Sequence, residues 1–458
     1  MQRARLTNPA TSWGLVVGAA LLACLCRPMD ASAQSAPAAP LVTFGHPEVA
    51  PEGVAAPKPV SGEIAPLLEV QPAAKPVVEL RGRINTDAIL VGQSARDQAI
   101  LGEIPNATGF RRAYLGVQGT VGEQVDWVAE FDFAGGVITF KDVFIGLEQL
   151  PIIRRVRVGH FLEPFSLEEL TNSNFFALVE YSPIVALGPG RNWGVGIFSY
   201  TDDERATFQT GAFRTGSNSA GDDFSTGNDM AYDVRITGLP WYEADGRYLL
   251  HLGGAFSQRY PYNQVVAIDQ SPQSSLLTSL DNPGSAFIPK ISVPASQQQL
   301  FNLQSALVLG PLSFQAEWSA TQIDQIGGGP VWLHGSYVFA SLFLTGENRD
   351  YLTKDGVFGM PHVRSPFLCL KGAKYLAGGP GAWELTARFA YADFASGNIP
   401  PVNGLKVGDR DAEFTLGVNW YLNDFTRLMF NYVHSVPVDP NFGPSYANTF
   451  YVRTAIFW

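Results

Sequence analysis

From about Leu80 to its last residue, the chain repeats segments of roughly ten residues in which apolar and polar side chains alternate. In the last segment, Val452, Ile456 and Trp458 occupy even positions and Arg453 an odd one. A period of two places one set of side chains on each face of a β-strand. One apolar and one charged face, repeated along a chain, is typical of an outer-membrane β-barrel.

A large soluble β-sandwich or barrel would alternate as well. Two features favour the membrane barrel. The apolar faces are rich in Trp, Phe and Tyr, and the polar faces carry charges in mid-strand, such as Arg112, Glu130 and Asp132. A charge that faces a packed core is costly, whereas a water-filled lumen accepts it. We therefore predict an all-β transmembrane barrel with Glu130 and Asp132 as lumen acids.

Sixteen segments fit antiparallel strands of this kind, and an even number brings both chain ends to the periplasmic side. Their expected limits are 79–91, 108–121, 123–134, 137–148, 154–162, 192–201, 205–214, 229–238, 246–258, 298–309, 311–322, 332–345, 381–395, 409–422, 425–436 and 446–458.

Three connections between these segments are too long to be simple connectors. Residues 163–191 and 259–297 fall on the extracellular side, and residues 346–380 form a long periplasmic turn. We predict that at least two of them, the periplasmic turn included, fold into the lumen.

The start of the chain predicts export. Residues 1–33 resemble a signal peptide, with basic Arg3 and Arg5, an apolar run over Leu15–Leu25 and a small-residue cleavage site at Ala31–Ala33. The apolar run is too short to cross a bilayer, and Leu21–Cys24 fits a lipoprotein box poorly. Outer-membrane localisation follows from the export signal and the barrel pattern together.

Residues 34–78 are rich in Pro and Ala, which forbids regular sheet. We expect a largely disordered periplasmic arm that is a plain spacer or a tether to the cell wall. The barrel domain then spans residues 79–458.

The composition points to neither catalysis nor cofactors. Cys24 and Cys26 fall within the predicted signal peptide, which leaves Cys369 without a disulfide partner, and no metal-spaced histidine pair or nucleophile elbow occurs. The formal net charge is −11, so nucleic acid is an unsuitable partner. We predict a protein that is not an enzyme and needs no cofactor or metal.

Several segments resemble the phosphate-selective porin family, the O and P porins, and they keep one order along residues 79–458. They are Leu80–Ile84 (LRGRI), Phe110–Leu115 (FRRAYL), Gly159–Phe161 (GHF), Phe165–Glu168 (FSLE), Leu344–Glu347 (LTGE), Gly381–Leu385 (GAWEL) and Leu416–Tyr421 (LGVNWY).

The resemblance implies a trimeric sixteen-stranded barrel in outer-membrane lipid, narrowed by two extracellular loops and one periplasmic turn. It also implies passive uptake of small inorganic anions along a ladder of arginines, to which lysines at the pore mouths supply the anions. Arg83, Arg111 and Arg112 match ladder positions, and Arg157 stands where the family has a lysine. These four residues are the predicted pore-lining, anion-binding groups, because guanidinium groups stay charged and offer forked donors to phosphate oxygens.

The sequence also departs from the family pattern. Glu79 and Glu169 stand where the family has lysines, and residues 259–297 hold only Arg259 and Lys290 as bases. These changes put tight phosphate specificity in doubt. A general or cation-preferring porin is the alternative, followed by a barrel adhesin or anchor and by a barrel enzyme.

Adjacent Arg111 and Arg112 pose a geometric problem, because neighbouring side chains on a strand point to opposite faces. Arg112 shares the polar face of Tyr114 and Gln118, which places it in the lumen. Arg111 would then face lipid or snorkel at the rim, unless the strand carries a bulge.

Overall fold

The computed structural model describes residues 76–101, 103–216, 227–268, 291–367, 378–396, 398–399, 410–437 and 445–458. The predicted signal peptide and residues 34–75 of the predicted arm lie outside these residues. Val77 and Val78, which were expected in the arm, belong to the first strand. The barrel therefore begins two residues earlier than the alternation predicts.

Sixteen strands in the described residues form one antiparallel barrel. They are β1 (Val77–Gln93), β2 (Ala107–Val121), β3 (Val125–Asp132), β4 (Thr139–Leu150), β5 (Arg154–Leu162), β6 (Arg191–Tyr200), β7 (Ala206–Arg214), β8 (Met230–Glu243), β9 (Tyr248–Arg259), β11 (Ile291–Leu309), β12 (Leu312–Gln325), β13 (Val331–Phe343), β16 (Ala382–Asp393), β17 (Arg410–Asn423), β18 (Thr426–Pro437) and β19 (Ala447–Phe457).

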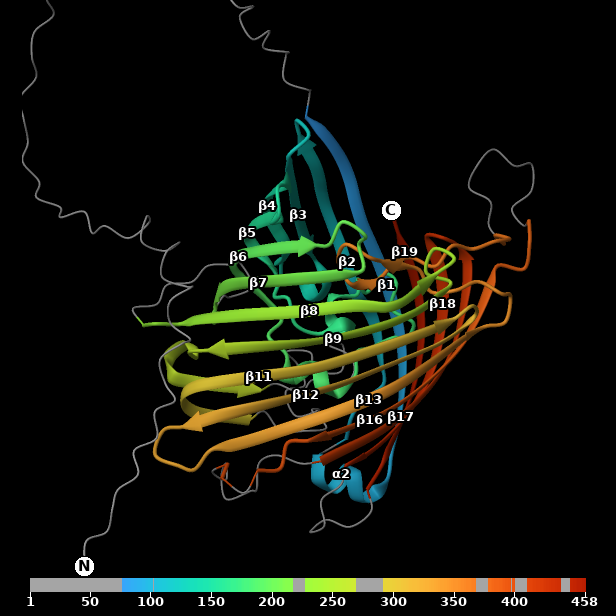
Figure 1. Ribbon diagram of the computed structural model, residues 1–458. Coiled ribbons are helices and arrows are strands. Elements are labelled where there is room, and N and C mark those ends of the chain that lie inside the picture. The colour runs from blue at the N-terminus through green and yellow to red at the C-terminus, as the bar shows by residue number, and fades with distance from the viewer. Residues whose placement is uncertain are drawn as a thin grey trace, which may run out of the picture. The chain divides into compact units, whose positions relative to one another are not determined.

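The barrel closes because β1 pairs with β2 on one side and with β19 on the other (Figure 1). At the closing seam, Gly82 and Trp458 exchange backbone hydrogen bonds of 3.1 Å. The first strand and the last residue therefore meet at one rim, which is the predicted periplasmic end. The sixteen-stranded architecture is confirmed.

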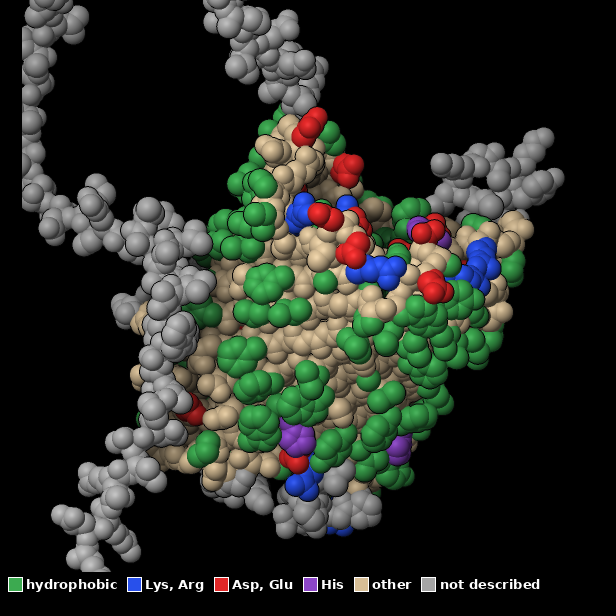
Figure 2. Space-filling view, viewed as in Figure 1, with side chains coloured by type: hydrophobic (Ala, Val, Ile, Leu, Met, Phe, Trp, Pro, Cys, Tyr) green, Lys and Arg blue, Asp and Glu red, His purple; other side chains and the backbone are tan. Residues whose placement is uncertain are grey.

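The two faces of the strands carry the predicted side chains. In β19, Tyr451, Arg453 and Ala455 are buried toward the lumen, whereas Val452 and Ile456 are exposed. Across the outer wall, apolar side chains cover the middle of the barrel and charges gather near the rims (Figure 2). An apolar outer band suits contact with lipid tails. Among the described residues, no helix has the length and hydropathy needed to span a membrane.

Two of the long connections fold into the lumen. The first, residues 163–190, is named the constriction loop here, and it holds α3 (Leu167–Leu170) and the short helix η2 (Pro183–Leu187). The second contains the lumenal hairpin, residues 351–358, with β14 (Tyr351–Leu352) and β15 (Val357–Phe358). Arg235 of β8 donates hydrogen bonds to the carbonyl oxygens of Asp355 and Gly356 in this hairpin. The predicted inward fold of the long periplasmic turn is confirmed.

The third connection adds structure that the alternation does not predict. The helical turn η3 (Tyr262–Gln264) precedes β10 (Val265–Ile268), which pairs with β11, and β11 begins at Ile291 rather than at residue 298. Val266 and Ile268 pack with Leu187 of the constriction loop. The remaining helices are α2 (Ala95–Leu101), between β1 and β2, and η1 (Ala134–Gly136), between β3 and β4.

Deletion of the lumenal hairpin, Tyr351–Phe358, should raise the single-channel conductance in a planar bilayer, because the hairpin occupies lumen cross-section next to β5, β7 and β8. Deletion of Gly327–Gly329, in the turn between β12 and β13, is the matched control and should leave the conductance unchanged. Equal conductance of wild type and the hairpin deletion would contradict this placement.

Candidate functional site in the lumen

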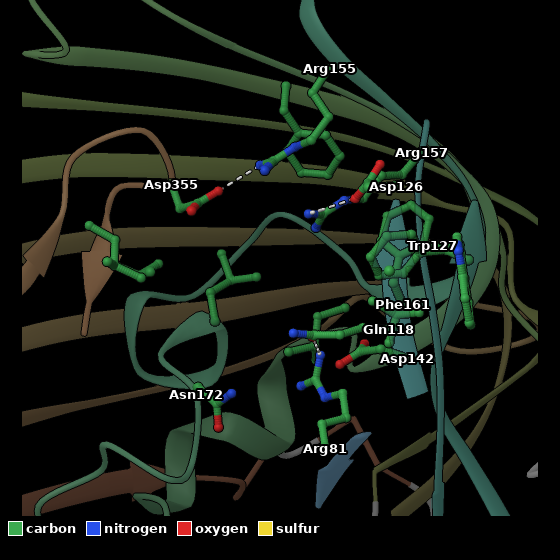
Figure 3. A pocket seen from close by; sticks show the side chains of 18 of the residues that line it. Arg81, Gln118, Asp126, Trp127, Asp142, Arg155, Arg157, Phe161, Asn172 and Asp355 are labelled. Atoms are coloured by element: carbon green, nitrogen blue, oxygen red, sulfur yellow. Dashed lines mark hydrogen bonds and ion pairs between the residues drawn. The ribbon is translucent and has the colours of Figure 1, made fainter. Parts of the chain in front are cut away.

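A cavity of about 590 Å³ lies inside the barrel. On one side it is lined by the wall strands β1 to β7, and on the other by the constriction loop and the lumenal hairpin. Asn172 of the loop and Asp355 of the hairpin lie across the cavity from Arg157 and Phe161 of β5 (Figure 3). This space is named the lumen cavity below.

The opposite part of the lumen, along β11 to β19, is filled by the constriction loop. Strand side chains bind its backbone directly: Arg427 donates to the carbonyl of Phe176 at 2.7 Å, and Asn419 to that of Ala177 at 2.6 Å. Glu317 accepts hydrogen bonds from the backbone N–H groups of residues 167 and 168 at 2.9 and 2.6 Å. The lumen cavity lies on the other side, along the β1–β7 wall.

Glu180 attaches the constriction loop to the barrel wall through charge. Its carboxylate accepts two hydrogen bonds from Arg111, at 2.6 and 2.9 Å, and one from Arg453 at 2.8 Å. Arg453 in turn binds Asp87 of β1 through two contacts of 2.7 Å. Burial alone would raise the pKa of Glu180, but Arg111, Arg453 and Arg112 lower it to about 2. The carboxylate therefore stays ionised in any ordinary buffer.

A β-bulge resolves the problem of the adjacent arginines. Asn85 of β1 pairs with Arg112 and Thr86 with Phe110, so Arg111 is the extra residue of the bulge. The bulge re-aims its side chain, which reaches Glu180 in the lumen instead of lipid. Both arginines thus lie on the inside of the barrel.

Arg83 and Arg112 are buried guanidinium groups that differ from Arg111 in having no acid beside them. Arg83 lies 3.8 Å from the ring centre of Tyr114 and donates to Asn174 at 3.0 Å and to Ser173. Nearby acids are bound elsewhere, Glu180 by Arg111 among them. Among the described residues, neither Arg83 nor Arg112 has a carboxylate within 4.0 Å. Neither guanidinium therefore forms an ion pair of its own among these residues, although Arg112 is close enough to lower the pKa of Glu180.

Arg157 and its neighbour Arg155 line the lumen cavity on β5. Arg157 lies over the ring of Phe144, 4.4 Å from its centre, and 4.0 Å from the Asp126 carboxylate. Arg155 forms a tighter pair of 2.6 Å with Asp355 of the hairpin (Figure 3).

The lumen acids hold basic groups in place. Glu130 accepts a hydrogen bond of 3.0 Å from Arg81. Asp132 accepts the backbone N–H groups of Ala113 and Ala134 at 3.1 and 3.0 Å, and Lys141 lies 3.6 Å away. Both carboxylates are buried.

Arg81 and Arg155 line the cavity although they were not among the predicted site residues. For Arg155 the signal is present in the sequence, since Arg155 and Arg157 alternate with Val156 and Val158. Three arginines and four acids line the cavity, namely Arg81, Arg155, Arg157, Glu79, Asp126, Asp142 and Asp355. The lining is therefore nearly balanced in charge. The part of the chain that the structure describes holds no cluster of three or more metal-ligating side chains.

Comparison with known proteins gives the family. The model of the family described as phosphate-selective porin O and P matches residues 78–437. This chain belongs to that family. It is also similar to Porin O of Pseudomonas aeruginosa, at 24% identity over 364 residues, which cover 72% of this chain and 77% of that protein.

Solved porin structures show a weaker similarity. OmpT of Vibrio cholerae has 11% identity and a TM-score of 0.48, with 85% of this chain and 100% of that chain covered. An anion-selective porin from Comamonas acidovorans has 12% identity and a TM-score of 0.48, with 83% and 100% covered. The barrel assignment rests on the strand pairing rather than on these low scores.

Family membership confirms the predicted porin class. The chain is an outer-membrane porin of a family of channels for small anions, and that family consists of channels rather than enzymes.

Asp355→Asn should raise the anion-over-cation permeability ratio by about threefold, because it removes the acid nearest to Arg155 and leaves Glu148 at 3.6 Å. In a wet site the removed charge repels an anion by less than about 1 kcal/mol. Burial raises the pKa of Asp355, but Arg155 and Arg157 hold it below its usual range, so the wild-type carboxylate is charged. Reversal potentials in a potassium chloride gradient measure the ratio. Asp202→Asn, at an exposed acid paired with Arg154, is the control, and an equal change in both variants would contradict the prediction.

Anion preference should rise as the pH falls from 8 to 6. Burial raises the pKa of Glu169 in the constriction loop to about 7, with Glu163 and Glu168 adding to the shift and Arg191 opposing it. Burial raises the pKa of the neighbouring Glu168 to about 7 as well. Below this pKa each carboxyl is neutral, so negative charge leaves the lumen. Glu169→Gln removes one of the two titrating groups and should reduce the change in reversal potential between pH 6 and 8. An unchanged pH profile in this variant would show that another group titrates.

Proposed function

We propose that small inorganic anions diffuse along the β1–β7 wall, past Arg83 and Arg112 and then past Arg157. The observation that carries the proposal is the pair of buried guanidinium groups, Arg83 and Arg112, with no carboxylate within 4.0 Å among the described residues. Such charges attract anions strongly because little water screens them. Arg111 has a different role in this proposal: it positions the constriction loop through Glu180.

The expected selectivity is for anions in general rather than for phosphate alone. Arg157 retains a positive charge where the family has a lysine, but Glu79 and Glu169 reverse the charge at two other lysine positions. Asp126 and Asp142 line the same cavity as Arg157. Because this lining is nearly balanced in charge, it should attract a divalent or trivalent anion little more strongly than it attracts chloride.

A pore that prefers cations is the second candidate, and one observation favours it. Four acids line the lumen cavity against three arginines. The nearest groups decide selectivity, so the outcome depends on whether Arg83 and Arg112 or the cavity acids dominate the potential along the path.

Export and assembly complete the proposal. Residues 1–33 supply the signal peptide, residues 34–76 form a periplasmic arm, and the barrels associate as homotrimers in outer-membrane lipid. The family supports the trimer. Detergent extracts run without heating should contain a species near three times the monomer mass.

Arg112→Ala should lower the anion-over-cation permeability ratio by about fivefold, the effect of about 1 kcal/mol of attraction by one charge roughly 4 Å away in water. Chloride and phosphate permeability should fall together, because the guanidinium attracts both. Reversal potentials in potassium chloride and potassium phosphate gradients measure both ratios. Arg205→Ala, in the turn between β6 and β7, is the control. A wild-type pore that selects cations would overturn the proposed function.

A further inference from the structure

The lumen cavity contains more apolar surface than the passage of inorganic ions requires. Leu170 and Phe175 of the constriction loop and Leu352 of the lumenal hairpin line it. Leu352 remains 41% exposed although it lies inside the barrel. Leu170 packs partly against a buried cluster and Phe175 against the ring of Phe457. Apolar surface that faces water is costly, so the exposed part of this lining suits contact with the apolar part of a solute.

On the wall side of the same cavity, an arginine lies against a cluster of aromatic rings. Phe144, Phe161 and Phe198 form one cluster of rings on the lumen face. Arg157 lies over two of them, 4.4 Å from the ring centre of Phe144 and 5.4 Å from that of Phe198. A guanidinium held against rings in this way is oriented and partly desolvated, which strengthens its attraction for an anion.

Arg157 also has free hydrogen-bonding capacity. Its nearest acid, Asp126, is 4.0 Å away, which is beyond hydrogen-bond distance. Its Nε is buried and has no hydrogen-bond partner among the described residues. Arg155, by contrast, is occupied by Asp355 at 2.6 Å. The cavity therefore holds one partly exposed guanidinium with unused donors, next to the apolar side chains of the loop and the hairpin.

We propose that the lumen cavity binds organic anions with an apolar body, of the class of aromatic carboxylates and phosphate monoesters. The anionic head contacts Arg157, and the body lies against Leu170, Phe175 and Leu352. The volume of about 590 Å³ is that of a small-molecule site and far exceeds the volume of an inorganic anion. This inference rests on the proposed function in that both use the β1–β7 path, but it adds a solute class.

Block of the potassium chloride current by phenyl phosphate and by methyl phosphate tests the inference, because the two esters differ only in their apolar body. Phenyl phosphate should half-block the current at a concentration about tenfold lower, the effect of burying roughly half of a phenyl ring. Leu352→Ser and Phe175→Ser should each weaken block by phenyl phosphate about threefold and leave block by methyl phosphate unchanged. Arg157→Gln should weaken block by both esters.

Ile326→Ser, in the exposed turn between β12 and β13, is the matched control. Both esters should block this variant at the same concentrations as they block wild type. Equal block by the two esters in wild type would overturn the inference, as would an unchanged ester ratio in both apolar variants. Reversal potentials in potassium chloride separate this result from the proposed function. If the pore selects cations but phenyl phosphate still blocks better than methyl phosphate, the proposed binding site stands and the proposed function is wrong. If the pore selects anions and the two esters block equally, the proposed function stands and the binding site is wrong.

Discussion

Guanidinium groups inside the barrel bind carboxylates, carbonyl oxygens and aromatic rings, and these contacts determine where the constriction loop lies. Removing a charge from water costs several kcal/mol unless a partner replaces the water. Arg453, Arg427 and Arg388 meet the requirement with loop atoms: Glu180, the Phe176 carbonyl, and the carbonyls of residues 180 and 181. The loop is therefore held against β16 to β19, opposite the lumen cavity along β1 to β7.

The arginines of the lumen consequently fall into two groups. Those that hold the loop and the hairpin, such as Arg111 and Arg235, donate hydrogen bonds to protein atoms. Arg157, which lines the lumen cavity, rests on the ring of Phe144 and has no acid within hydrogen-bond distance. Arg83 rests on the ring of Tyr114 and also donates to Ser173 and Asn174 of the constriction loop. The same residue type thus builds the constriction and provides its charge, and sequence position alone does not separate the two roles.

The strands could be predicted from the sequence because a period of two is a local signal that lipid and lumen impose on every strand. The lumenal segments were predicted only from their length, since residues 163–190 have no period and are held by partners far away in the chain, as Glu180 is by Arg453. The side of Arg111 depended on a bulge opposite Asn85 and Thr86, which alternation cannot reveal. The pairing of Arg155 with Asp355 joins residues 200 positions apart and leaves no local trace.

Cysteine accessibility during current recording tests most directly whether the path runs along the β1–β7 wall. In a background with Cys369→Ser, Gln118→Cys places a thiol at a partly exposed position of the cavity lining, and Asn419→Cys places one beneath the constriction loop, at a fully buried position. We expect an anionic methanethiosulfonate reagent to reduce the current through the Gln118→Cys pore and to leave the Asn419→Cys pore unchanged. Equally fast modification at both positions would show that solutes also pass along β16 to β19, and would contradict the assigned path.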